Sequence, residues 1–222
     1  MNYSEAISFP FQDEKWAKKI LTGGLFVILS SLGLVFVTGF GVMGYYIGLL
    51  RQVMAGEEKP LPEWNNWPKI FADGLLGGII AFIYLLIIGG VMAFSIVQLV
   101  DEPGLRDAEL ALTITVVAVV GILSLSVLTN LALARFAATD DFRSAFGFPE
   151  MWRLLLGNFG NYLSISVFSL ILNGLLFLAG LGIFSPFTNF WGLVVQAHLF
   201  GQAARSMTAL DPLPSVAPRS AS

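Results

Sequence analysis

The sequence predicts an all-α fold: a polytopic transmembrane helical bundle of about six membrane helices, arranged as three hairpins. Two observations predict this class. Hydrophobic residues make up 56% of the 222 residues and charged residues only 12%, which is too few charges to cover the surface of a soluble globule. Long charge-free runs also alternate with clusters of Lys and Arg, which is typical of membrane helices with basic cytoplasmic ends.

The first hairpin is expected at about 20–50. This run is longer than one span of about 20 residues needs and short for two spans. If it crosses twice, eleven of the twelve basic residues face the cytoplasm, and if it crosses once the split is eight against four. We therefore expect two crossings, with a single crossing or a re-entrant segment as the alternatives. The chain is expected to reverse at Gly39 and Gly41, because glycine tolerates the dihedral angles of a tight turn.

The glycines of this run also have a second spacing pattern. Gly39, Gly41 and Gly44 match G-x-G-x-x-G, which binds dinucleotides when it lies between a strand and a helix of an α/β domain. No such alternation of strands and helices follows in this sequence. Gly44 and Gly48 instead form a G-x-x-x-G pair, which predicts close packing against another helix.

The second hairpin is expected at about 74–135, where two charge-free runs each fit one span. The third is expected at about 157–205, in a run long enough for two spans that a turn signal around Pro186 divides. The three hairpins form a single transmembrane domain over residues 1–209, with both chain ends in the cytoplasm. Residues 210–222 are rich in Pro and Ser and are expected to be a disordered tail.

A similar motif precedes each hairpin, with Pro, an acid, Trp, a base, an apolar pair and Gly in this order. Each copy is expected to form a short interfacial amphipathic helix, because Trp favours the headgroup level and basic side chains extend to the phosphates. A plain membrane anchor without a ligand is the simplest interpretation. The expected contacts with lipid or a partner are Trp16, Lys18, Lys19, Trp64, Trp67, Lys69, Trp152 and Arg153. The hairpins close on Arg51, Arg135 and Arg205.

Several short motifs together resemble a known family. They are Gly44-Tyr45, the segment Leu61-Pro-Glu-Trp-Asn-Asn-Trp67, Asp73-Gly74, and His198-Leu-Phe-Gly-Gln202 with Arg205. They resemble the prokaryotic membrane family called domain of unknown function 4013, over most of the chain. The resemblance implies a multi-pass protein of the prokaryotic plasma (inner) membrane, and it implies no established activity or catalytic residues.

The sequence predicts no catalytic residues, no metal site and no cofactor. Acidic residues are expected only in loops and at interfaces, and cysteine is absent. The single histidine, His198, is the one candidate ligand for a haem, chlorophyll or quinone, and a structural histidine that bonds a neighbouring helix is the favoured alternative. The intramembrane amides are expected to join helices: Gln98, Asn130, Asn161, Asn173, Gln196 and Gln202.

These observations favour a non-catalytic integral membrane protein, a structural, assembly or accessory subunit that packs against lipid or another membrane protein. The alternative is a small transporter or channel for an apolar or amphiphilic substrate, since repeated helical units are common in transporters. A third hypothesis is a membrane enzyme that uses Glu63, Asp73, Asp140 and Glu150. Membrane lipids and another membrane protein or complex are the expected partners, and the small net charge of −3 argues against nucleic acid.

Overall fold

The computed structural model describes residues 2–31, 35–57, 61–100, 107–180 and 184–208, and regular secondary structure in these parts is entirely helical. The predicted all-α class is therefore confirmed. Two 3₁₀ helices, η1 and η2, accompany eight α-helices in the described residues. The elements are α1 (Tyr3–Ser8), η1 (Phe9–Gln12), α2 (Trp16–Ser31), α3 (Val35–Ala55), α4 (Trp67–Val100), α5 (Asp107–Thr139), η2 (Phe142–Phe146), α6 (Phe148–Gly157), α7 (Phe159–Ala179) and α8 (Ser185–Thr208).

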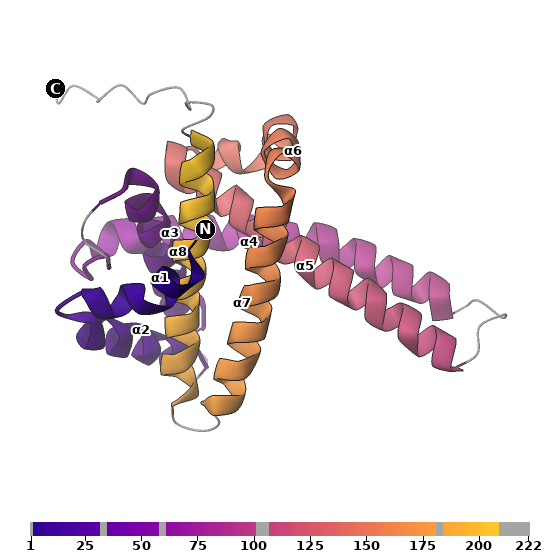
Figure 1. Ribbon diagram of the computed structural model, residues 1–222, viewed down its shortest axis with the longest axis horizontal. Coiled ribbons are helices and arrows are strands. Elements are labelled where there is room, and N and C mark those ends of the chain that lie inside the picture. Colours follow the sequence, from indigo (N-terminus) through magenta and orange to yellow (C-terminus); the bar gives the residue numbers. More distant parts are fainter. Residues whose placement is uncertain (1, 32–34, 58–60, 101–106, 181–183, 209–222) are drawn as a thin grey trace.

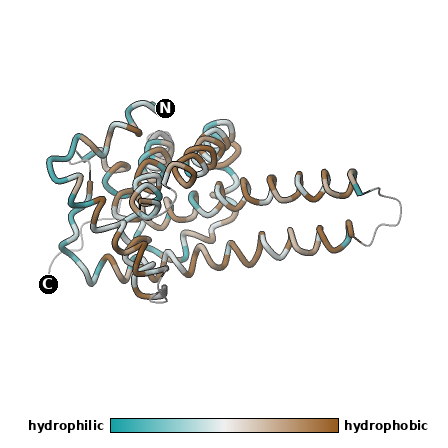
Figure 2. Tube along the Cα trace, turned by 90° about the horizontal axis from the view of Figure 1, so that it is seen from below, coloured by the Kyte–Doolittle hydropathy of each residue, from teal (hydrophilic) through white to brown (hydrophobic). Residues whose placement is uncertain are grey.

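Six helices pack as three consecutive pairs, α2 with α3, α4 with α5, and α7 with α8. These pairs lie near the positions expected for the three hairpins. They do not share one direction, because α4 and α5 run out as a long arm, across the direction of α7 and α8 (Figure 1 and Figure 2). The helices therefore differ from the aligned six-helix bundle that we expected.

Three helices of the described chain are long and apolar enough to cross a membrane: α4, α5 and α7. None of the other described helices meets these criteria, so the expected six spans are not shown. Helix α2 has only 16 residues. Helix α8 packs against α1, α2, α3, α5 and α7, and α3 packs against α2, α4, α5 and α8. Because neighbouring helices shield α3 and α8, these two can carry polar side chains that a lipid-facing helix would expose to hydrocarbon.

The hydrophobic core lies where α3, α5, α7 and α8 meet. Its fully buried large side chains include Tyr45, Ile47, Leu49, Leu50, Leu131, Phe136, Tyr162, Ile165, Phe190 and Phe200. Within a membrane these side chains stabilise the core through close packing, because lipid tails are as apolar as the side chains. Helix α8 contributes buried residues along most of its length and forms the centre of this region.

The distal part of the arm has a different character. No residue of α4 beyond Tyr84 and no described residue of α5 before Gly121 is buried. We call residues 85–100 and 107–120 the distal arm. Figure 2 colours most of its residues brown to white, as hydrophobic or intermediate, with hydrophilic residues mainly at the tip.

Helices α3 and α4 cross in backbone contact at Gly44 and Gly74. A Cβ atom on Gly44 would lie 1.8 Å from the carbonyl oxygen of Ile70, and one on Gly74 would lie 1.8 Å from that of Phe40. Any side chain larger than hydrogen at either position would therefore force the two helices apart. Gly48 differs, because a Cβ there would meet only Pro62, at 3.8 Å.

The expected turn at Gly39 and Gly41 is wrong, because both glycines lie inside α3, which begins at Val35. Gly41 serves helix packing instead. A Cβ atom there would lie 2.7 Å from the ring of Phe26, so glycine makes room for this ring of α2.

Separate short helices precede the first pair, where α1 and η1 come before α2, and the third pair, where α6 comes before α7. In the second unit α4 begins directly at Trp67 and continues to Val100, so the short helix expected there is absent from the described residues. In the first unit α2 likewise begins at Trp16. Pro68 lies in the first turn of α4, where backbone N–H groups have no partner within the helix. Its missing N–H group therefore does not interrupt the helix. The expected tail, 210–222, lies outside the described residues.

Candidate functional site

The segment Leu61–Trp67 is held to the start of α2 by a buried lysine. The Lys19 side chain is only 5% exposed, and its ammonium group lies 2.8 Å from Asp13 Oδ2 and 2.9 Å from Glu63 Oε1. It also donates a hydrogen bond to the carbonyl oxygen of Leu61 at 2.9 Å. All three donors of the ammonium group thus have acceptors, which offsets the cost of its burial. We call Asp13, Lys19 and Glu63 the lysine triad.

The two carboxylates of the lysine triad have pKa values below the ordinary range. For Glu63, the hydrogen bond from Lys19 is the main cause of the lowered pKa. For Asp13, burial raises the pKa, but hydrogen bonds from Lys19 and from the Lys15 backbone lower it by more in total. Both acids are therefore held in the charged form at neutral pH.

Trp64 is the centre of an aromatic cluster beside the lysine triad. Its ring stacks on Tyr45 with centroids 4.3 Å apart, on Phe26 at 5.3 Å and on Trp67 at 5.6 Å. The indole N–H donates to the carbonyl oxygen of Lys19 at 3.3 Å. Trp64 thus joins α2, α3 and the start of α4, and is half-buried, whereas Trp16 and Trp67 are partly exposed.

Arg51 joins the ends of three helices. Its guanidinium group forms ion pairs with Asp73 of α4 and with Asp140 beyond α5. Its Nε donates to the carbonyl oxygen of Ala137 at 3.1 Å. Lys69 Nζ lies 3.6 Å from carboxylate oxygens of both Asp73 and Asp140. The planar, forked guanidinium suits such a simultaneous contact with two acids and a carbonyl.

The other two hairpin-closing arginines also lie at helix ends. Arg135 Nε donates to the carbonyl oxygen of Ser144 at 2.8 Å and so ties η2 to α5. Arg205 lies against Gly56, where a Cβ atom would be 2.6 Å from its Nη2. Gly56 has φ of +70° and ends α3 in a left-handed conformation that favours glycine.

Helix α6 presents apolar side chains on two faces. Met151 and Leu155 face the protein and are buried. Phe148, Trp152 and Leu156 are spaced four residues apart and are each about 60% exposed. Arg153 lies beside them, also exposed. This outward stripe runs into Phe159 at the start of α7, one of the three candidate spans, and is compatible with the interfacial position expected for Trp152 and Arg153.

His198 is buried in α8 and stacks on Phe9, with ring centroids 4.0 Å apart and planes 12° from parallel. Its Nδ1 has no hydrogen-bond partner within the described residues. Helices α7 and α8 also hold the N-terminal segment, since Tyr3 hydrogen-bonds Ser164 of α7 at 2.8 Å and the Asn2 N–H donates to Gln202 of α8 at 3.4 Å. His198 thus helps to seat α1 and η1 on the core. The described residues contain no group of acids or histidines arranged to bind a metal.

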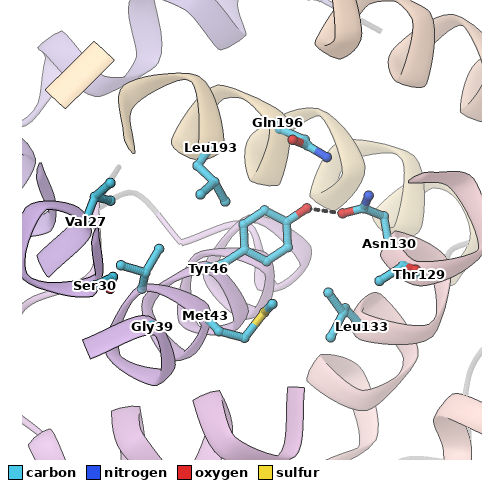
Figure 3. Close-up of a pocket in the computed structure, with 11 residues that line it drawn as sticks. Val27, Ser30, Gly39, Met43, Tyr46, Thr129, Asn130, Leu133, Leu193 and Gln196 are labelled. Atoms are coloured by element: carbon cyan, nitrogen blue, oxygen red, sulfur yellow. Dashed lines mark hydrogen bonds between the residues drawn. The ribbon is translucent and has the colours of Figure 1, made fainter. Parts of the chain in front are cut away.

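A cavity of about 340 Å³ opens between α2, α3, α5 and α8 (Figure 3). Tyr46 donates a hydrogen bond to Asn130 Oδ1, and Asn130 Nδ2 donates to the carbonyl oxygen of Ser126 at 2.7 Å. Thr129 and Gln196 lie at the same end of the cavity in Figure 3. The full lining is Val27, Ser30, Gly39, Val42, Met43, Tyr46, Thr129, Asn130, Leu133, Leu193 and Gln196.

A second cavity of about 170 Å³ lies between α5, α7 and α8, and Gln196 also contributes to its lining. Ser126 donates to Ser166 at 3.2 Å, and Asn173 donates to the carbonyl oxygen of Ser169 at 2.8 Å. The Ser169 hydroxyl is buried without a partner in the described chain. Polar side chains therefore line two cavities that share Gln196, although the sequence predicted that these groups join helices.

The remaining predicted amides have simple structural surroundings. Asn161 donates to Asn158 Oδ1 at 3.4 Å, and Gln98 is exposed on the distal arm. Among the acids of the enzyme hypothesis, Glu63, Asp73 and Asp140 are paired with cations. These ion pairs join helices and segments of the fold, so the geometry gives no support to the enzyme hypothesis.

No curated protein and no solved structure matches this chain significantly. A family model does match. It is described as "Protein of unknown function (DUF4013)" and covers residues 25–185, which is most of the sequence.

Proposed function

The chain belongs to the DUF4013 family of proteins of unknown function, and from its geometry we propose a non-catalytic role in the membrane. The protein acts as an accessory subunit that packs against another membrane protein through the distal arm. The observation that carries this proposal is the lack of any buried residue in the distal arm.

The whole α4–α5 pair, whose outer part is the distal arm, is longer than a membrane anchor needs. Helix α4 has 34 residues, which at about 1.5 Å per residue extends roughly 50 Å. The hydrocarbon core of a bilayer is about 30 Å thick. A pair of such helices presents apolar side chains outward on both sides, among them Phe94, Val97, Leu112 and Val116.

Three hydroxyl groups of the distal arm are hydrogen-bonded within their own helices. The hydroxyl groups of Ser95, Thr113 and Thr115 donate to the carbonyl oxygens of Val91, Glu109 and Ala111, at distances of 2.8–2.9 Å. No cost of unpaired hydroxyl groups therefore opposes contact with an apolar partner helix. Association of such helices in lipid depends on shape and close packing, because lipid tails are as apolar as the side chains.

A photocrosslinking experiment tests this proposal in the native membrane. A photoreactive amino acid replaces Phe94 on the distal arm, and in a matched variant it replaces Phe177 on the outer face of α7, where the side chain is similarly exposed. We expect the Phe94 variant to give one discrete protein adduct and the Phe177 variant to give lipid adducts. Lipid adducts alone at both positions would contradict an accessory role for the arm.

A second candidate function is a small transporter for an amphiphilic substrate, which the two cavities that meet at Gln196 favour. Flux of a labelled amphiphile across proteoliposomes separates this function from the first. An accessory subunit without transport activity leaves the flux at the level of protein-free liposomes.

A further inference from the structure

We propose that the cavity of Figure 3 is a binding site for a neutral amphiphile with one hydrogen-bonding head group and an apolar body of about a dozen heavy atoms. This inference is independent of the proposed role of the distal arm, because the cavity lies in the core of the molecule, between α2, α3, α5 and α8. Alcohols, amides and carbonyl compounds with an alkyl body belong to this ligand class.

The volume of the cavity sets the size of the ligand. At about 30 Å³ for each small non-hydrogen group, 340 Å³ holds roughly eleven such groups. Most of the wall is apolar and comes from Val27, Val42, Met43, Leu133 and Leu193. Apolar walls with a few convergent polar groups are typical of small-molecule sites.

One end of the cavity has unused hydrogen-bonding capacity. The Thr129 hydroxyl is buried and has no partner in the described chain. The Tyr46 hydroxyl uses its proton on Asn130 and keeps an acceptor lone pair free, and Asn130 uses one of its two amide hydrogens on Ser126. A head group that both donates and accepts, such as a hydroxyl or a primary amide, can bond Thr129 and Tyr46 together. Unpaired buried polar groups are costly, so a ligand that pairs them gains affinity.

Gln196 stands where the two cavities meet, and its side-chain amide lies near the polar end in Figure 3. It can bond a head group in either cavity. The wall therefore offers a hydroxyl and an amide from two different helices, α5 and α8, to the same ligand.

The head group is neutral because none of the eleven lining residues is charged. An ionised head group would lose its hydration without gaining a counter-ion, at a cost of several kcal/mol. The ligand enters from the surface of the molecule, since Val27, Met43, Thr129 and Leu193 are only half-buried. The apolar body then lies along the wall toward Gly39 and Ser30, away from Asn130.

Gly39 offers a way to fill the cavity without disturbing the fold. It lines the cavity, and a Cβ atom built on it would meet no heavy atom within 4 Å. Gly90, on the distal arm, is equally open. Gly39→Leu and Gly90→Leu therefore form a matched pair in which the same side chain is added inside and outside the site.

Saturable binding of tritiated 1-decanol to the full chain in lipid nanodiscs, measured by scintillation proximity, tests the site. Saturation separates site binding from partition into lipid. We expect saturable binding that Gly39→Leu abolishes and Gly90→Leu leaves unchanged. Thr129→Val and Gln196→Leu should each weaken binding roughly three- to tenfold, as expected for the loss of one hydrogen bond. Decane and decanoate should compete at least tenfold less well than 1-decanol.

Three results would overturn the proposal. They are no saturable binding, binding that Gly39→Leu and Gly90→Leu reduce alike, and equal competition by decane and 1-decanol. The thermal unfolding temperature of each variant is measured alongside. If Gly39→Leu fails to fold, Thr129→Val tests the site instead, because it only changes one buried hydroxyl to a methyl group of similar size. Unchanged affinity in Thr129→Val together with Gln196→Leu would overturn the polar end of the site.

Discussion

Lys19 shows how a basic residue in an interfacial motif can be used inside the protein. Its neighbour Lys18 is exposed, as expected for a side chain that extends to lipid phosphates, whereas Lys19 is buried between Asp13 and Glu63. The sequence pattern of Trp and Lys does not distinguish the two lysines. Only the approach of the Leu61–Trp67 segment to α2, which brings in Glu63 and the Leu61 carbonyl, makes the interior position favourable.

Replacing Lys19 with methionine should destabilise the fold by about 3–5 kcal/mol. The change leaves the Asp13 carboxylate, which is about 9% exposed, without its cation, and an unpaired buried charge is costly. Lys18→Met is the matched control and should change the free energy of unfolding by less than about 0.5 kcal/mol. Chemical unfolding in detergent micelles, followed by circular dichroism, measures both. Equal stability of the two variants would contradict the role of the lysine triad.

The lysine triad also predicts a loss of stability in acid. Asp13 and Glu63 have pKa values lowered in the folded state, so the stability that they contribute is fully present above their unfolded values, about 4, and is lost as the pH falls through the lower folded values. The unfolding temperature in micelles should therefore fall as the pH drops below about 4. The Lys19→Met variant should show a much smaller change over this range. A parallel decrease in both proteins would mean that other groups cause it.

At the scale of helices, the contact between α3 and α4 depends on two glycines far apart in the sequence. The G-x-x-x-G pair predicted a close approach at Gly44 and Gly48, but only Gly44 touches the backbone of the neighbouring helix. On α4 the contact is made by Gly74, which the sequence analysis noted only as the end of a motif. A spacing pattern indicates that a helix can approach closely, but it does not indicate which other helix does so or at which glycine.

Gly44→Ala should destabilise the protein by about 1–3 kcal/mol or more, because the new methyl group would overlap the Ile70 carbonyl oxygen and force α3 and α4 apart. Gly48→Ala is the control, since its methyl group meets only Pro62 at an ordinary contact distance. Gly48→Ala should be neutral or slightly stabilising, because alanine favours helix. Thermal unfolding of both variants in the same detergent measures the difference. A Gly44→Ala variant as stable as Gly48→Ala would rule out the tight crossing.

The elements that the sequence predicted well are those that face away from the protein. Helices α4, α5 and α7 each contain a long apolar window, so their runs stand out by composition alone. The boundary between α2 and α3 was misplaced, because Gly39 and Gly41 look like a turn but lie inside α3, where Gly41 makes room for the ring of Phe26. The sequence predicted a separate short helix around Trp67 and Pro68. In the structure, α4 instead continues from this motif into the span without a break.

The described chain combines a packed core with the distal arm. The two helices of the arm contact each other, but no other part of the described chain buries their side chains. The sequence predicted the helical class and the positions of three helix pairs, because both follow from hydropathy and charge. It did not predict that α4 and α5 run across α7 and α8. Direction depends on contacts between distant segments, such as the ion pairs of Arg51 with Asp73 and Asp140.

The candidate binding site is also a property of the whole molecule. Asn130 and Gln196 were recognised as intramembrane amides, but Tyr46 and Thr129 gave no signal in the sequence. The four residues come from α3, α5 and α8 and meet only after the helix pairs pack. Helical spacing within any one of these helices does not bring them together.

The central claim is that the distal arm lies in the hydrocarbon of a membrane, and spin-label accessibility measures this most directly. The chain has no cysteine, so a single Cys at Phe94 or Lys18 carries the only label. In liposomes, we predict that the label at Phe94 collides more often with oxygen, which dissolves in lipid, than with a water-soluble nickel chelate, and that the label at Lys18 shows the opposite preference. A label at Phe94 that prefers the nickel chelate would place the arm in water and contradict the account.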